Sequence, residues 1–179
     1  MDDTEDISTI NEKELIEYYG YGKTLGKLQL KLRFLRSWIL HSLAYFSPHP
    51  GFTIKMQRAR GVKIGEGCYI GPYVHIDLLY PNLITIEDNV AIGSNSMIFA
   101  HVNPAANLEL KKNHYPRKID PVLLKSGTWI NPACIITLGT IMGKNSILSI
   151  GSVAVSSIPD NCLAIGNPAR VVKKLTDNT

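Results

Sequence analysis

The chain has 179 residues, enough for one domain with a substantial core but not for two independent ones. Apolar residues make up 45% and charged residues 19% of it, which excludes a disordered segment and a membrane-embedded protein. The net charge is +4, and much of the basic excess lies between Lys23 and Arg36 and between Arg170 and Lys174. Neither cluster has the arrangement of a nucleic-acid-binding stripe.

Three features bear on the cellular compartment. The first six residues are mostly acidic, whereas a secretory signal begins with basic residues. The longest mostly apolar stretch, Phe34 to Phe46, contains Arg36 and His41 and is too short to span a bilayer. The cysteines are odd in number and lack metal-type spacing, as expected in a reducing compartment: Cys68, Cys134 and Cys162. We therefore expect a cytoplasmic protein.

Residues 1–50 are predicted to form a helical cap. Asn11 to Glu14 has the spacing of a capping box, which indicates a helix start. A longer helix should follow and end at Pro48 and Pro50. Its apolar residues recur at steps of three and four and form one stripe: Leu25, Leu28, Leu32, Leu35, Ile39, Leu43 and Phe46. We expect this stripe to pack against the first unit of the repeat that follows; the alternative is a basic amphipathic helix on a membrane.

An internal repeat with a period of six dominates the rest of the chain. Aliphatic residues recur at this step: Ile64, Ile70, Ile76, Ile86, Ile92, Ile98, Leu124, Ile130, Ile136, Met142, Leu148 and Ala154. Four places after most of them stands a small or β-branched residue: Cys68, Val74, Val90, Ser96, Thr128, Cys134, Thr140, Ser146 and Ser152. Each hexad is therefore predicted to be a short strand plus a corner, with both kinds of residue pointing inward. Cys68 and Cys134 are interpreted as packing residues.

These hexads resemble those of the left-handed β-helix acyltransferases, which include maltose, galactoside and xenobiotic acetyltransferases. The segments that match best are 77–90 and 158–170, and the resemblance covers about 62–174. It implies a mainly β fold, a left-handed parallel β-helix of about four coils, in a domain at 51–174 followed by a tail at 175–179. It also implies a homotrimer and acetyl-CoA as the acyl donor, with no metal.

The repeat is interrupted between Ile98 and Leu124, and the extruded loop at 99–121 is predicted to form the wall of an active site. Acetyl transfer from a thioester needs a base near neutral pH, a role that histidine fits. His101 stands where the hexads open into the loop, which is where the family places its general base. His101 is therefore the predicted catalytic base.

Further candidate residues surround the acceptor and the donor. By resemblance Asp77 lines the acceptor pocket, where it could also orient the imidazolium of His101; the alternative is a turn aspartate. Asn103 and His114 lie in the loop and could contact the acceptor. The resemblance also implies that main-chain groups near Ser149, Val155 and Ser156 bind the pantetheine arm of coenzyme A, and that Arg170 and Lys173 face its phosphates.

The predicted function is transfer of an acetyl group to a hydroxyl of a sugar or polysaccharide precursor. N-acetylation of an amino sugar would use the same base, so the sequence leaves it open. A zinc carbonic anhydrase on the same fold would need His75 and His114 beside His101. An inactive scaffold is the remaining alternative.

Overall fold

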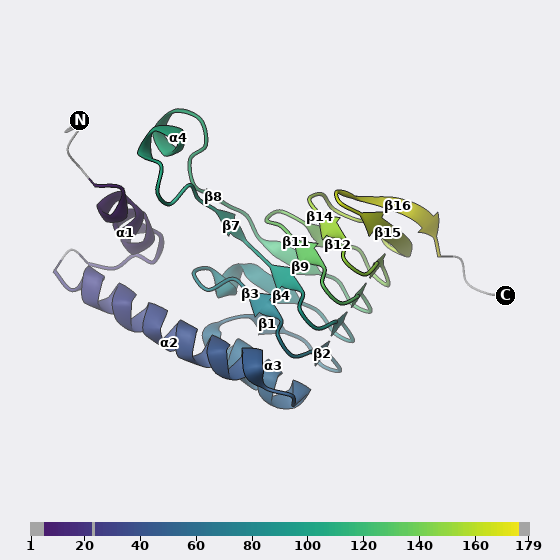
Figure 1. Cartoon of the computed structure of the whole chain (residues 1–179). Helices are drawn as coiled ribbons and strands as arrows, with labels where there is room; N and C mark the ends of the chain where they lie inside the picture. The colour runs from purple at the N-terminus through teal and green to yellow at the C-terminus, as the bar shows by residue number, and fades with distance from the viewer. Residues whose placement is uncertain (1–5, 23, 176–179) are drawn as a thin grey trace.

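A computed structural model of the chain describes residues 6–22 and 24–175. Three helices, α1 (Ile7–Tyr18), α2 (Gly26–Phe46) and α3 (Pro50–Arg60), precede a column of short strands (Figure 1). Of the tail predicted at 175–179 only Leu175 is described, and the first five acidic-rich residues lie outside the described part. In the described part of the chain, no helix is long and apolar enough to cross a membrane.

The strands form three parallel sheets, which the chain visits in turn. The first contains β1 (Lys63–Ile64), β4 (Ile84–Ile86), β9 (Val122–Leu124) and β12 (Ile141–Met142). The second contains β2 (Tyr69–Ile70), β5 (Ala91–Ile92), β10 (Trp129–Ile130) and β13 (Ile147–Leu148). The third contains β3 (His75–Ile76), β6 (Met97–Ile98), β11 (Ile135–Ile136) and β14 (Val153–Ala154). Finally, β15 (Cys162–Gly166) extends the second sheet and pairs antiparallel with β16 (Ala169–Lys174). Consecutive strands from β1 to β6 and from β9 to β14 belong to different sheets, so the chain winds as a parallel β-helix.

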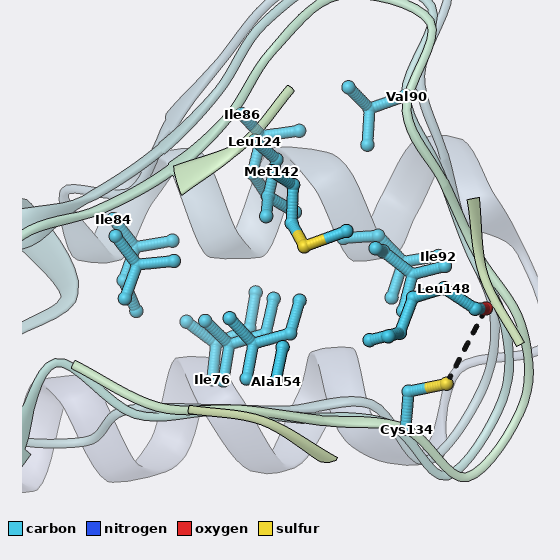
Figure 2. Close-up of a cluster of buried hydrophobic side chains, with 14 of the residues drawn as sticks. Ile76, Ile84, Ile86, Val90, Ile92, Leu124, Cys134, Met142, Leu148 and Ala154 are labelled. Carbon is cyan, nitrogen blue, oxygen red and sulfur yellow. Dashed lines mark hydrogen bonds between the residues drawn. The ribbon is translucent and has the colours of Figure 1, made fainter. Parts of the chain in front are cut away.

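The hexad residues stack in register inside this helix. The columns are Ile64, Ile86, Leu124 and Met142 in the first sheet, Ile70, Ile92, Ile130 and Leu148 in the second, and Ile76, Ile98, Ile136 and Ala154 in the third. All except Ile64 are buried, and Figure 2 shows members of the three columns pointing toward one axis. The prediction that these residues form the core is confirmed. Each fully buried aliphatic side chain contributes about 1.5–3 kcal/mol.

The small residues four places later also point inward, and of these only Cys68 is half-buried rather than buried. The Cys134 thiol lies 3.0 Å from the carbonyl oxygen of Ser149. Burial raises the pKa of Cys134, which disfavours the nucleophilic thiolate. Cys134 is thus a packing residue, as predicted.

Helix α1 begins at Ile7, so the helix start predicted at Asn11 was wrong. Asn11 lies inside the helix, where its side-chain amide donates to the carbonyl oxygen of Ala105 at 3.1 Å. The side chain therefore makes a tertiary contact rather than capping the helix.

Helix α2 follows the predicted bounds closely, but its leucine stripe faces away from the molecule. The residues that α2 buries are Gly26, Ser37, His41 and Ala44. Ser37 donates to the carbonyl oxygen of Leu78 at 2.9 Å, and His41 Nδ1 lies 3.0 Å from the Arg60 guanidinium. The inward face is polar because it hydrogen-bonds to α3 and to the main chain after β3. The expectation that the stripe packs against the repeat was wrong.

Helix α3 was not predicted, because Pro50 was taken as a stop signal. It stands instead in the first turn of α3, where proline is well tolerated. Ile54 of α3 packs against the core, and the helix lies against β1 and β2. The helical part of the chain thus extends to Arg60, past the boundary expected at residue 50.

Candidate active site

The segment between β6 and β9 forms a short antiparallel ribbon. In it, β7 (His101–Val102) pairs with β8 (Lys118–Ile119), and α4 (Leu108–Asn113) connects them. The ribbon projects from the body of the β-helix and carries α4 toward the N-terminal helices (Figure 1). His101 is the first residue of this ribbon, so it lies where the chain leaves the repeat.

The imidazole of His101 is held by a buried carboxylate. His101 Nδ1 lies 2.5 Å from Asp77 Oδ2; the Asp77 side chain is fully buried, and that of His101 is 20% exposed. Asp77 Oδ2 also accepts the N–H of Ala100 at 3.0 Å. Asp77 Oδ1 accepts the N–H groups of Leu79 at 2.9 Å and Tyr80 at 3.1 Å. Aspartate suits this turn because its short carboxylate reaches main-chain N–H groups two and three residues ahead.

These contacts keep Asp77 ionised. Burial by itself raises the pKa of this carboxyl, but the hydrogen bond and charge of His101 and the N–H groups of Tyr80 and Ala100 outweigh it, so the pKa is lowered. An ionised Asp77 can only accept, so Nδ1 of His101 must carry a proton. In the neutral imidazole the lone pair then lies on Nε2, the arrangement that a general base requires.

A buried cation, Arg60, holds the main chain at Asp77 in place. Its guanidinium donates to the main-chain oxygen of Asp77 at 2.7 Å and to that of Ile76 at 3.3 Å. Burial lowers the pKa of Arg60 to about 10, against the attraction of Asp77, which raises it. The group remains charged at neutral pH. Arg60 was not among the predicted site residues, because α3 was not predicted.

Tyr80 packs against the base and was also missed. Its buried ring lies 5.0 Å from the His101 ring, and Arg117 Nη1 donates to its hydroxyl oxygen at 2.8 Å. Burial raises the pKa of Tyr80, and the nearby Arg117 only partly offsets this. The hydroxyl therefore stays protonated at neutral pH. In the sequence, only its position shortly after Asp77 indicated that Tyr80 could lie near the site.

A polar network ties the ribbon to α1. Lys111, which is 5% exposed, donates to Asn11 Oδ1, Glu14 Oε2 and Asn103 Oδ1 at 2.7–2.9 Å. Arg117 Nε donates to the same Glu14 oxygen at 2.7 Å. The Asn103 amide also donates to Asn11 Oδ1 at 3.1 Å. Asn103, predicted to bind the acceptor, thus uses both ends of its amide to fix the ribbon.

No family model matches the chain. In sequence the chain is 33% identical over 116 residues to galactoside O-acetyltransferase of Escherichia coli, an alignment that covers 65% of this chain and 55% of that protein. Its fold is similar to that of a hexapeptide-repeat acetyltransferase of Vibrio cholerae, with 18% identity, a TM-score of 0.67, and coverage of 89% of this chain and 96% of the other. For a maltose O-acetyltransferase of Clostridium difficile the identity is 23% and the TM-score 0.63, with coverage of 93% and 97%. The chain resembles the hexapeptide-repeat acetyltransferases.

The likeness to hexapeptide-repeat acetyltransferases agrees with the left-handed parallel β-helix that the resemblance implied. The aligned structures cover 89% and 93% of this chain, which is more than the β-helix alone. The chain spans little more than half the length of the E. coli relative.

The residues assigned to coenzyme A from the hexapeptide-repeat resemblance lie apart from His101. Arg170 and Lys173 are exposed on β16, at the end of the β-helix opposite the N-terminal helices (Figure 1). Val155 and Ser156 are exposed in the bend after β14. The Ser149 N–H already donates to the Ala164 carbonyl oxygen at 2.9 Å, so this donor is used within the β-helix.

His75 and His114 do not form a metal site with His101. His114 is exposed at the end of α4. The half-buried ring of His75 lies 4.8 Å from that of His41 and 5.4 Å from that of Phe99, and burial lowers its pKa. Across residues 6–22 and 24–175, no group of three His, Cys, Asp or Glu side chains is arranged to hold a metal ion.

Proposed function

We propose that the chain is an acetyl-CoA-dependent acyltransferase that acetylates a hydroxyl of a sugar or polysaccharide precursor, with His101 as the general base. The observation that carries the proposal is the 2.5 Å contact between Asp77 and His101 Nδ1. Sequence similarity to galactoside O-acetyltransferase of E. coli supports the choice of a sugar hydroxyl. Acetyl-CoA as donor is supported by the acetyl-CoA complex of the V. cholerae acetyltransferase.

Acetyl transfer would proceed in one addition and one elimination. His101 Nε2 takes the proton of the acceptor hydroxyl while the oxygen attacks the thioester carbonyl carbon. A main-chain N–H stabilises the oxyanion that forms. When the intermediate collapses, the C–S bond breaks and the imidazolium returns its proton to the coenzyme A thiolate. Asp77 stabilises the imidazolium throughout without becoming protonated.

The wider arrangement follows the hexapeptide-repeat pattern. We take the parallel sheets as about four coils and the segment at 99–121 as an extruded loop that forms one wall of the site. Coenzyme A would lie along the last coils, with Val155 and Ser156 near its arm and Arg170 and Lys173 near its phosphates. A homotrimer would place the site between neighbouring subunits, which allows donor and acceptor residues that are far apart in one chain to meet.

The proposal is tested with His101→Ala, with His49→Ala as a control at an exposed histidine outside the loop. Acetyl transfer from radiolabelled acetyl-CoA to a panel of sugars and lipid-linked glycans is measured, with hydroxyl and amino acceptors assayed separately. We expect loss of the base to slow transfer by roughly 100-fold or more, with coenzyme A binding retained, and His49→Ala to stay near wild type. Unchanged turnover in His101→Ala would refute the assignment.

A further inference from the structure

An apolar stripe runs along the outer face of α2. We define it as Leu28, Leu32, Leu35, Ile39, Leu43 and Phe46, which are between 44% and 70% exposed. At about 1.5 Å per residue the stripe is about 27 Å long. The opposite face, with Ser37, His41 and Ala44, packs against the body of the molecule. An exposed apolar surface of this length and regularity marks an interaction site.

The segment of the chain that carries the stripe has charges of one sign. Between Tyr18 and Gly65 the sequence contains no Asp or Glu, although the whole chain has 15. The same segment holds nine of the 19 Lys and Arg residues: Lys23, Lys27, Lys31, Arg33, Arg36, Lys55, Arg58, Arg60 and Lys63. At 3.6 residues per turn, Lys31 borders the stripe on one side and Arg36 on the other, and both are exposed. Arg36 Nη2 donates to the main-chain oxygen of Ala59 at 2.7 Å, which holds this side chain at the edge of the stripe. The stripe therefore lies inside a basic border.

The carboxyl end of the stripe broadens into a hollow shared with α3. Trp38, Leu43, Phe46 and Phe52 line this open hollow, whose volume is about 740 Å³. Its lining is mainly apolar, and three of these four side chains are aromatic. Tryptophan is favoured where an apolar layer meets water, because its ring is apolar and its N–H is polar.

The charge pattern selects among possible occupants of the stripe. Two copies of α2 facing each other would bring basic borders together with no carboxylate from either helix to neutralise them. Crossing a bilayer is excluded for the described helices. An anionic lipid surface satisfies both features at once, because it offers apolar chains to the stripe and phosphates to the lysines and arginines.

We propose that α2 lies flat on an anionic lipid bilayer, with the stripe at the boundary between headgroups and acyl chains and with Lys31 and Arg36 among the phosphates. Long basic side chains suit this position, because their stems stay apolar while their charged ends reach the headgroups. Ser37, on the opposite face, contacts the main chain beside Asp77. The membrane and the candidate site are thus separated by about one helix diameter, about 10 Å.

The test is co-sedimentation of the full chain with vesicles of phosphatidylcholine containing roughly 30% phosphatidylserine, compared with pure phosphatidylcholine. The wild type should bind the anionic vesicles, and high salt should weaken this binding. The double variant Leu32→Glu/Ile39→Glu should lower the partition coefficient by at least ~10-fold, since each buried aliphatic side chain is worth that much or more. Ile150→Glu, which changes a 67% exposed isoleucine on the β-helix, is the matched control and should bind like the wild type.

Two further measurements separate membrane binding from folding, catalysis and self-association. With Trp129→Phe, Trp38 is the sole tryptophan, and its emission should shift to the blue when anionic vesicles are added. The double variant should keep the wild-type melting temperature and acetylate a water-soluble acceptor at the wild-type rate. Failure of the wild type to bind anionic vesicles would overturn the proposal. So would a fall in oligomer mass of the double variant without lipid, because the stripe would then join two copies of the chain.

Discussion

Asp77→Asn is the sharpest probe of the candidate site, because it changes the charge and keeps the shape. The carboxylate accepts four N–H groups, from Leu79, Tyr80, Ala100 and His101. An asparagine replaces one acceptor oxygen by an NH2 group. If the NH2 faces His101 and Ala100, the Ala100 N–H loses its acceptor, the NH2 donates to Nδ1, and the proton of the imidazole moves to Nε2. The base then points its N–H, rather than its lone pair, at the acceptor.

Both consequences have a magnitude. A buried N–H group left without an acceptor costs about 1–3 kcal/mol, and in this orientation one such group, that of Ala100, is left. For a chain of this size that corresponds to a melting temperature lower by about 2–12 °C. The wrong tautomer reduces kcat by up to ~10⁴ in a histidine dyad that works this way, as in the serine protease triad. The rate loss thus far exceeds what partial unfolding explains at a temperature where the variant is folded.

The assay measures kcat from the release of the coenzyme A thiol at saturating acetyl-CoA, and the melting temperature by circular dichroism. Asp120→Asn, at an exposed aspartate at the end of the same segment, is the control and should change neither quantity. Residues that act as one unit are not additive, so Asp77→Asn combined with His101→Ala should be no slower than His101→Ala alone. A variant with lowered stability but kcat within about threefold of wild type would make Asp77 a turn residue only, and would contradict the orientation of His101 argued above.

Three other predictions follow from burial and charge. Arg60→Met should lower the free energy of unfolding by about 3–5 kcal/mol, because the Asp77 main-chain oxygen loses its buried donor. Urea unfolding measures this change, and a decrease below about 1 kcal/mol would argue against the role of the buried cation. Ile130→Ala, in the middle of a core column, should cost about 2–5 kcal/mol in the same experiment, whereas Ile150→Ala at an exposed position should stay within about 0.5 kcal/mol. Because the pKa of Asp77 is lowered on folding, the unfolded chain binds more protons than the folded chain at acidic pH. The stability that Asp77 confers is complete above the pKa of the unfolded chain, about 3.9, and is lost as the pH falls through the lower pKa of the folded chain. Acid titration of the unfolding free energy should therefore be shallower in Asp77→Asn than in the wild type, and equal slopes would contradict the depressed pKa.

The β-helix was predictable because its geometry imposes a strict sequence period. A prism of stacked coils places every sixth residue on the axis, so Ile92, Ile130 and Leu148 appear in sequence at the phase at which they pair in space. A single sequence therefore reveals the core. The positions of the corners were predictable for the same reason. Asn89, Asn95 and Asn145 stand at such corners and adopt the positive φ that the turns need.

The helices were harder because an amphipathic pattern does not say what its apolar face contacts. The spacing located α2 correctly but predicted its orientation wrongly, since Ser37 and His41 form the inward face through hydrogen bonds that no periodicity reveals. The missed helix α3 also hid Arg60. For the site, the break in the repeat pointed to His101 and the resemblance pointed to Asp77, but the contact of His101 with Tyr80 depends on a turn conformation that only the structure provides.

The way the chain leaves and rejoins the β-helix has a consequence for how such a protein could change its acceptor. Strand β9 resumes beside β4 with Ile84 opposite Val122 and Ile86 opposite Leu124, so the column of core residues continues as if residues 99–121 were not there. Beyond the β7–β8 pairing, the ribbon is fastened chiefly by side chains of α1, through Lys111 and Arg117. The tip of the ribbon and α1 can therefore be exchanged together as one unit. The strands of the β-helix, with Asp77 and His101 at their edge, would keep their pairing register.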